Sequence, residues 1–247
     1  MQERAPLVCV HGAGAGGWEW AIWARVFAAR GRAAIAPDLM PAAAGLAATH
    51  VADYRAQVVA WCAGAGAAPI LAGASLGGLL ALSAAAEVRP VALVLVNPLP
   101  PAGVLARPLR RAAARHAEHE RPGAIVPWGR SRSLGGTRRA LEGCDDAACL
   151  YAFRRWRDES GAVIAEARAG IVVEPPRCPV LVISGGRDQE VPPSVGRALA
   201  TRLGADFIRL PDAGHVDPLL GRVAADCAER AAAWLSLRLD TAAVHPR

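Results

Sequence analysis

Six short apolar runs alternate with alanine-rich stretches along the chain, and this alternation limits the fold more than any other feature. The runs cover residues 6–12, 33–39, 69–75, 91–98, 179–186 and 206–212. Most are apolar throughout, which is typical of strands that are buried on both faces. Segments long enough for crossover helices lie at about 18–30, 51–63, 76–88, 194–203 and 219–238. The pattern predicts an α/β fold with a mainly parallel sheet flanked by helices.

One segment, residues 102–177, interrupts this alternation. It is rich in Ala and Arg, contains no convincing strand, and is bracketed by the proline-rich turns PLPPAG and VVEPPRCP. We interpret it as a helical cap that is inserted after the fourth strand, with residues 1–101 and 178–247 forming the core. The chain of 247 residues suits one such domain with an inserted lid.

The sequence GASLG, with Ser75 at its centre, follows the third apolar run and precedes a predicted helix. The pattern G-x-S-x-G is weak by itself in a glycine-rich chain, but strand, turn and helix in this order are what a nucleophile elbow requires. Small residues around the Ser let the strand and the helix approach closely, so that the hydroxyl points into a site. The alternative is a glycine-rich turn in which Ser75 caps the helix.

With this motif, the chain resembles the α/β-hydrolase fold superfamily over nearly its whole length. Its start, HGAGAGGWEW followed by APDL, resembles the esterase and hydroxynitrile lyase branch. That branch has a His-Gly loop, a Trp soon afterwards and an Asp-Leu at the end of the next strand. In the plant lyases a Lys on the cap side helps to stabilise the cyanide leaving group, and this chain contains no Lys.

A serine hydroxyl needs a base, and the base needs an orienting acid. The resemblance implies the chain order Ser, acid, His, and places the base just beyond the last strand, where His215 lies in LPDAGHVDP. The acid that it implies is Asp188 in ISGGRDQEVPP, with Glu190 as the neighbouring rival. Some relatives carry the acid one strand earlier, where this chain has Asn97-Pro98.

Other acids and histidines near these motifs fit poorly. Turn formation or exposure explains Asp212 and Asp217 better than catalysis does. The remaining histidines outside the first loop precede a helix, lie in the tail or belong to the charged insertion: His50, His245, His116 and His119. The i, i+3 spacing of the last two suggests a metal pair, but without a third ligand a solvated helix face is the better interpretation. We expect no metal and no organic cofactor.

The first loop, HGAGAGG, has two interpretations. Its glycines at positions 12, 14 and 17 give G-x-G-x-x-G after a predicted strand, and Asp38 ends the next strand, where a ribose-binding acid would lie. In a hydrolase the same loop supplies the backbone N–H of Ala13, which forms an oxyanion hole with the N–H of Leu76. A dinucleotide fold would leave Ser75, Asp188 and His215 without roles, so we favour the hydrolase.

Three residues of this region are assigned to the substrate-binding wall: His11, Gly12 and Trp18. Trp20 and Trp23 fit packing better than contact with a substrate.

The net charge of +6 comes entirely from Arg, because the 28 basic residues include no Lys. Residues 102–177 hold 14 Arg against 9 Asp and Glu. Codon bias explains most of this excess, but a basic cap would attract an anionic substrate or an acyl-carrier protein. We expect no nucleic acid, because no aromatic stacking pattern accompanies the charge.

No apolar stretch reaches the roughly 18 residues of a membrane span, and we expect no membrane partner. The six cysteines are scattered without metal-ligand spacing. A strand is predicted almost at the start of the chain, so we expect no secretory signal. A cytoplasmic location is therefore expected.

Together these features predict a serine hydrolase that cleaves a small carboxylic ester or related acyl compound through an acyl-enzyme. An acyl-CoA or acyl-carrier-protein thioesterase would use the same three residues and is the first alternative. A hydroxynitrile lyase and a ligand receptor without turnover are the others.

Overall fold

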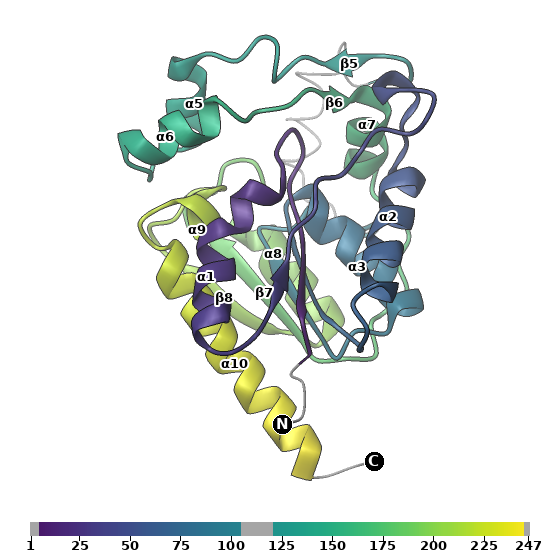
Figure 1. Cartoon of the computed structure of the whole chain (residues 1–247), viewed down its shortest axis with the longest axis vertical. Helices are drawn as coiled ribbons and strands as arrows, with labels where there is room; N and C mark the ends of the chain where they lie inside the picture. Colours follow the sequence, from purple (N-terminus) through teal and green to yellow (C-terminus); the bar gives the residue numbers. More distant parts are fainter. Residues whose placement is uncertain (1–4, 105–120, 245–247) are drawn as a thin grey trace.

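The computed structural model describes residues 5–104 and 121–244. One six-stranded sheet runs through its centre in the order β2-β1-β3-β4-β7-β8 (Figure 1). Its strands are β1 (Leu7–Val10), β2 (Ala34–Ile35), β3 (Ile70–Ala74), β4 (Ala92–Val96), β7 (Val180–Gly185) and β8 (Asp206–Leu210). Every neighbouring pair is parallel. The predicted α/β fold and all six predicted strands are confirmed, although β2 is much shorter than its apolar run.

The four inner strands, β1, β3, β4 and β7, are buried on both faces because their residues point alternately to one helix layer and the other. In β1, Leu7 and Cys9 pack with α1 and α10, whereas Val8 and Val10 pack with α2, α3 and α8. These helices are α1 (Ala21–Ala29), α2 (Val51–Ala63), α3 (Leu76–Val88), α8 (Pro193–Leu203) and α10 (Ala224–Val244). Burial on both faces is why the runs are apolar throughout.

Two details of the helices differ from the prediction. The first begins as a 3-10 turn, η1 (Gly17–Trp20), before α1. The helix predicted over 219–238 is split into α9 (Asp217–Leu220) and α10, because Gly221 takes an extended backbone conformation between them. α2 and α3 have the predicted bounds.

The insertion forms a layer of its own over the end of the sheet from which the loop after β1 rises (Figure 1). Its elements are β5 (Ile125–Val126), α5 (Leu134–Ala140), α6 (Asp146–Phe153), β6 (Glu159–Ser160) and α7 (Gly161–Ala169). The antiparallel pair β5–β6 was not predicted, because strands of two residues are too short to leave a sequence pattern. Residues 105–120, with His116 and His119, and the tail, with His245, lie outside the described part.

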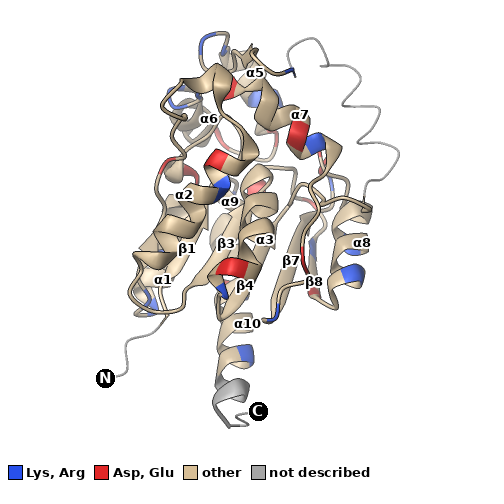
Figure 2. Cartoon of the chain, turned by 90° about the vertical axis from the view of Figure 1, so that its right-hand side faces the viewer, with Lys and Arg blue, Asp and Glu red and all other residues tan. Residues whose placement is uncertain are grey.

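Figure 2 shows an acidic and a basic position next to each other on α7, whereas α8 carries basic positions only. Several cap arginines are paired: Arg130 binds Asp158 and Arg138 binds Asp146. The charge of the cap is therefore partly neutralised within the cap.

Candidate active site

Ser75 occupies a sharp turn between β3 and α3. Its φ of +51° and ψ of −119° are a conformation that residues other than Gly rarely adopt. A Cβ at Gly73 would stand 2.2 Å from the carbonyl oxygen of Gly77, and one at Gly77 would stand 2.2 Å from that of Val10. Gly73 is thus required by the close approach of β3 and α3, and Gly77 by the close approach of α3 to the end of β1.

Three residues that the sequence analysis selected form one hydrogen-bonded chain. Ser75 Oγ lies 2.9 Å from His215 Nε2, and His215 Nδ1 lies 2.7 Å from Asp188 Oδ2. The other carboxylate oxygen of Asp188 accepts the backbone N–H groups of Glu190 and Val191, each at 2.8 Å. These contacts orient the carboxylate, which in turn fixes the tautomer of the imidazole.

The surroundings of His215 are acidic. Burial disfavours the imidazolium, but the carboxylates of Glu190 and Asp188, with a smaller contribution from Glu19, outweigh it and raise the pKa of His215 to about 9. Glu190, the predicted rival acid, lies on the other side of the ring from Asp188, with Oε2 3.7 Å from Nε2. It therefore faces the nitrogen that is hydrogen-bonded to Ser75 Oγ.

The loop that carries His215 is held by two further polar residues. Asn97, at the end of β4, donates from Nδ2 to the carbonyl oxygen of His215 at 2.6 Å and accepts the Gly185 N–H at 2.7 Å. The carboxylate of Asp217 accepts the Gly214 N–H at 2.7 Å. The sequence analysis explained Asp217 by turn formation or by exposure. Because Asp217 is buried, turn formation is the explanation that applies.

In the sequence, Asn97 was noted only because some relatives carry their catalytic acid at the end of this strand. A polar residue directly after an apolar strand was the signal for its structural role. Asp212, by contrast, is exposed and pairs with Arg187.

We call residues 11–17 the glycine loop. Three of its backbone N–H groups donate to carboxylates: Gly12 to Glu19 and Gly14 to Glu159, both at 3.0 Å, and Gly17 to Asp38 at 2.7 Å. A pyrophosphate would have to compete with these anions, which argues against the dinucleotide interpretation.

Two donors near Ser75 are left for another acceptor. Within residues 5–104 and 121–244, the backbone N–H groups of Ala13 and Leu76 have no hydrogen-bond acceptor. Leu76 is the first residue of α3, where no intrahelical acceptor exists. Gly12 brings the glycine loop against the nucleophile turn, since a Cβ there would stand 3.5 Å from Ser75 Cβ. The site can thus offer two N–H groups to a negative charge.

Of the residues expected in the substrate-binding wall, His11 is buried and hydrogen-bonded to backbone. His11 is 2% exposed, and both ring nitrogens bind backbone: Nδ1 lies 2.8 Å from the Gly12 carbonyl oxygen, and Nε2 accepts the Leu39 N–H at 2.8 Å. Burial lowers the pKa of His11 to about 4, so the ring is neutral with its proton on Nδ1. The His11 side chain is thus held between the backbone groups of Gly12 and Leu39.

The tryptophans of this region divide between cap and core. Trp18 packs edge-on against Tyr151 and Trp156 of the cap, with ring centroids 5.7 and 5.5 Å apart. Trp20 and Trp23 are fully buried in the core, as predicted. Trp18 therefore joins the glycine loop to the cap.

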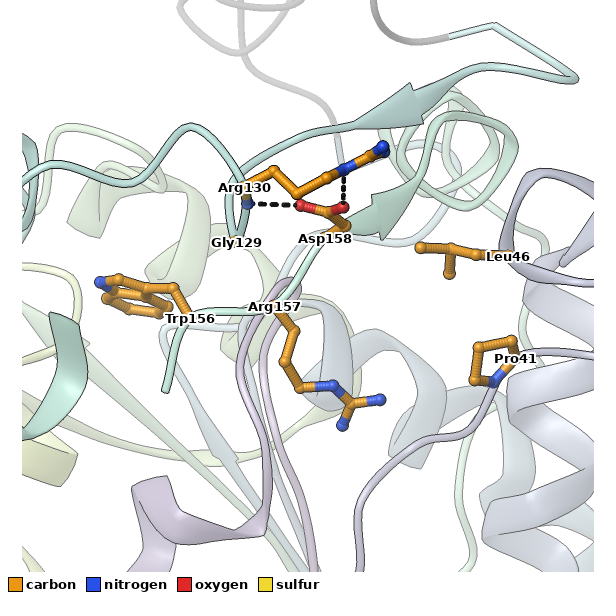
Figure 3. A pocket seen from close by; sticks show the side chains of 7 residues that line it. All are labelled: Pro41, Leu46, Gly129, Arg130, Trp156, Arg157 and Asp158. Atoms are coloured by element: carbon orange, nitrogen blue, oxygen red, sulfur yellow. Dashed lines mark hydrogen bonds and ion pairs between the residues drawn. The ribbon is translucent and has the colours of Figure 1, made fainter. Parts of the chain in front are cut away.

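A cavity of about 300 Å³ lies where the cap meets the loop after β2 (Figure 3). Its lining residues are Pro41, Leu46, Gly129, Arg130, Trp156, Arg157 and Asp158. The Arg157 guanidinium donates to the Leu39 carbonyl oxygen at 2.7 Å and lies 3.4 Å from Asp38. Arg157 therefore fastens the cap to the core on this side.

No helix among the described residues has the length and apolar character needed to cross a membrane. No group of three or more His, Cys, Asp or Glu side chains in the described part could hold a metal ion.

Comparisons with known proteins agree with this architecture. The model of the alpha/beta hydrolase family matches residues 7–231. Among solved structures, the chain is similar to a protein described as a candidate non-heme bromoperoxidase from Mycobacterium tuberculosis, at 23% identity and a TM-score of 0.72, over 94% of this chain and 92% of that one.

Two esterase structures are also similar. For a thermophilic esterase from Thermogutta terrifontis the identity is 20% and the TM-score 0.68, over 94% of this chain and 89% of that one. For polyneuridine aldehyde esterase the identity is 19% and the TM-score 0.67, over 92% and 99%. At these identities the likeness shows the fold. A search of curated proteins gave no significant match.

Proposed function

The chain belongs to the alpha/beta hydrolase family, and we propose that it is a serine hydrolase that cleaves a small carboxylic ester or a related acyl compound. The observation that carries the proposal is the hydrogen-bonded chain from Ser75 through His215 to Asp188. Next to it, the N–H groups of Ala13 and Leu76 lack an acceptor among the described residues. This is the arrangement that acyl transfer needs: a nucleophile, an oriented base and donors for an oxyanion.

In the first half-reaction, Ser75 Oγ attacks the substrate carbonyl carbon while its proton passes to His215 Nε2. The carbonyl oxygen gains the electron pair of the broken π bond, and the N–H groups of Ala13 and Leu76 stabilise this charge. The tetrahedral intermediate collapses when the bond to the leaving group breaks. The leaving group takes the proton from His215, and the acyl group stays on Ser75.

In the second half-reaction, a water molecule replaces the leaving group. His215 Nε2 takes a proton from the water as its oxygen attacks the acyl carbon. The bond to Ser75 then breaks, Ser75 Oγ recovers a proton from His215, and the carboxylic acid departs. Asp188 keeps its hydrogen bond to Nδ1 throughout and stabilises the imidazolium.

A cytoplasmic location is also part of the proposal. It is supported by the six cysteines, all of which are free in the structure.

Labelling with a fluorophosphonate probe tests the mechanism. We expect the wild-type protein to be labelled and the Ser75→Ala variant to remain unlabelled. Lack of labelling in folded wild-type protein would contradict the mechanism and favour a receptor without turnover.

A panel of p-nitrophenyl esters and acyl thioesters with equal acyl chains tests the substrate class. The proposal expects the esters to be hydrolysed with kcat/KM at least equal to that of the thioesters. If the thioesters are hydrolysed much faster, the protein is a thioesterase and the proposal of an esterase is wrong.

A further inference from the structure

Ala13 lies between two peptide units that are held by different parts of the molecule, and its N–H belongs to the first of them, together with the Gly12 carbonyl. On one side, the Gly12 carbonyl oxygen binds Nδ1 of His11 at 2.8 Å. On the other side, the Gly14 N–H donates to Glu159 Oε2 at 3.0 Å. The first contact holds the plane that contains the Ala13 N–H, and the second holds the plane that is joined to it at the Ala13 Cα. Together they set the direction in which the Ala13 N–H points.

Glu159 comes from the cap, 145 residues away from Gly14 along the chain. Its carboxylate is buried, at 3% exposed, and accepts three hydrogen bonds. Besides the Gly14 N–H, these come from the Tyr54 hydroxyl and the Ser160 N–H, both at 2.8 Å to Oε1. A buried carboxylate is costly unless it is well paired, and hydrogen bonds to an ionised group are stronger than neutral ones.

The cap encloses Gly14 with two more contacts. The backbone N–H of Arg157 donates to the Gly14 carbonyl oxygen at 2.7 Å. The Trp128 ring fills the place of a side chain, since a Cβ at Gly14 would stand 2.6 Å from its Cε3. Gly14 also has a φ of +66°, which favours glycine. The shape of the glycine loop at Ala13 therefore depends on the seated cap.

We propose that Glu159 is a positioning residue, through which the docked cap fixes the Ala13 N–H as an oxyanion donor. This inference rests on the proposed function, because it assigns Glu159 to the same acyl-transfer site. Removing an oxyanion donor outright typically lowers kcat by about 10²–10³-fold. Releasing Gly14 leaves the donor present but poorly directed, so a smaller loss is expected.

The test compares Glu159→Gln with Glu166→Gln as a matched control. Glu166 is also a cap carboxylate that binds a backbone N–H of the core, that of Val51 at 2.9 Å, but it does not touch the glycine loop. The amide introduced by Glu159→Gln has one acceptor oxygen for the three donors that the carboxylate satisfies. The measurements are kcat and KM for a p-nitrophenyl ester, Tm, and Ki for two inhibitors with the same acyl chain.

The inhibitors separate positioning from general structure. A trifluoromethyl ketone forms an oxyanion on Ser75, whereas the methyl ketone binds without forming one. For Glu159→Gln we expect kcat to fall about 10- to 100-fold. The Ki of the trifluoromethyl ketone should rise by a similar factor, while KM and the Ki of the methyl ketone stay within about twofold. Glu166→Gln should change Tm at most.

If Glu159→Gln does not fold, Tyr54→Phe decides, because it removes one donor to Glu159 and keeps the charge. It should give a smaller loss of the same kind. If the wild type is active and the folded Glu159→Gln variant has the same kcat and the same affinity for the trifluoromethyl ketone, the role of Glu159 is overturned and the proposed function stands. A wild type that neither hydrolyses esters nor reacts with fluorophosphonate would overturn both proposals.

Discussion

Glu190 Oε2 lies 3.7 Å from His215 Nε2, on the side of the imidazole that faces Ser75. The carboxylate stabilises the imidazolium, and the pKa of His215 is raised to about 9. Because only the neutral imidazole can accept the Ser75 proton, kcat/KM should rise with pH up to about 9.

The variant Glu190→Gln should move this rise to lower pH. A charge at about 4 Å contributes about 1 kcal/mol even in bulk water, which corresponds to a little under one pKa unit. The measurement is kcat/KM for a neutral ester from pH 5 to 10. Asp212→Asn, which removes a charge from an exposed residue of the His215 loop, is the control and should leave the midpoint in place. An equal midpoint in Glu190→Gln and wild type would contradict the role of Glu190.

The position of Glu190 also predicts which leaving groups are favoured. In the proposed mechanism the leaving group takes its proton from His215 Nε2, so it would depart next to this carboxylate. At low salt, a choline ester should therefore have a higher kcat/KM than the isosteric, neutral 3,3-dimethylbutyl ester, and a 2-sulfoethyl ester a lower one. Glu190→Gln should bring the three values together. Faster turnover of the sulfoethyl ester would instead support the anionic substrate that the Arg content suggested.

The sequence predicts the sheet and most helices because these features leave local patterns, whereas the chain order of Ser75, Asp188 and His215 is implied by the resemblance to the α/β-hydrolases. Apolar runs mark strands, and G-x-S-x-G marks a turn. Glu159 leaves no such pattern: in the charged segment RDESG it looks like any solvated acid, and only the tertiary fold brings it to Gly14. Glu19, between two tryptophans in WEW, carried a signal of burial that the sequence analysis did not use.

His11 and Glu19 should give stability opposite dependences on pH. The pKa of His11 is lowered from 6.5 to about 4, so its contribution is complete above pH 6.5 and is lost as pH falls toward 4. Burial raises the pKa of Glu19 from 4.5 to about 7, despite the Gly12 N–H that favours its charged form. Its contribution is complete below pH 4.5 and is lost as pH rises through 7. Each effect is on the order of 3 kcal/mol, so they largely cancel in the wild type.

Single variants should reveal each half of this balance. Between pH 4.5 and 6.5, the free energy of unfolding of Glu19→Gln should rise with pH more steeply than that of the wild type. That of His11→Gln should fall with pH over the same range. Urea denaturation at several pH values measures both slopes. Parallel curves for the two variants would show that neither group titrates as its surroundings imply.

The conformation of Ser75 predicts that glycine at this position makes the protein more stable than alanine does, although both substitutions abolish activity. At φ +51° and ψ −119° a Cβ is strained, and only Gly relieves that strain. Ser75→Gly should therefore be about 1 kcal/mol more stable than Ser75→Ala, even though Gly gives the unfolded chain more freedom. For a chain of this length, that is about 2–4 °C in Tm.

Ala74→Gly is the control for Ser75→Gly, because Ala74 lies in β3 with an ordinary strand conformation. Glycine should destabilise the protein there by about 0.5–1 kcal/mol or more. Urea denaturation at pH 7 compares the variants, and the two Ser75 variants share the loss of the hydroxyl. If Ser75→Ala were the more stable of these two, the turn would hold no strain, and close packing of Gly73 and Gly77 alone would explain its shape.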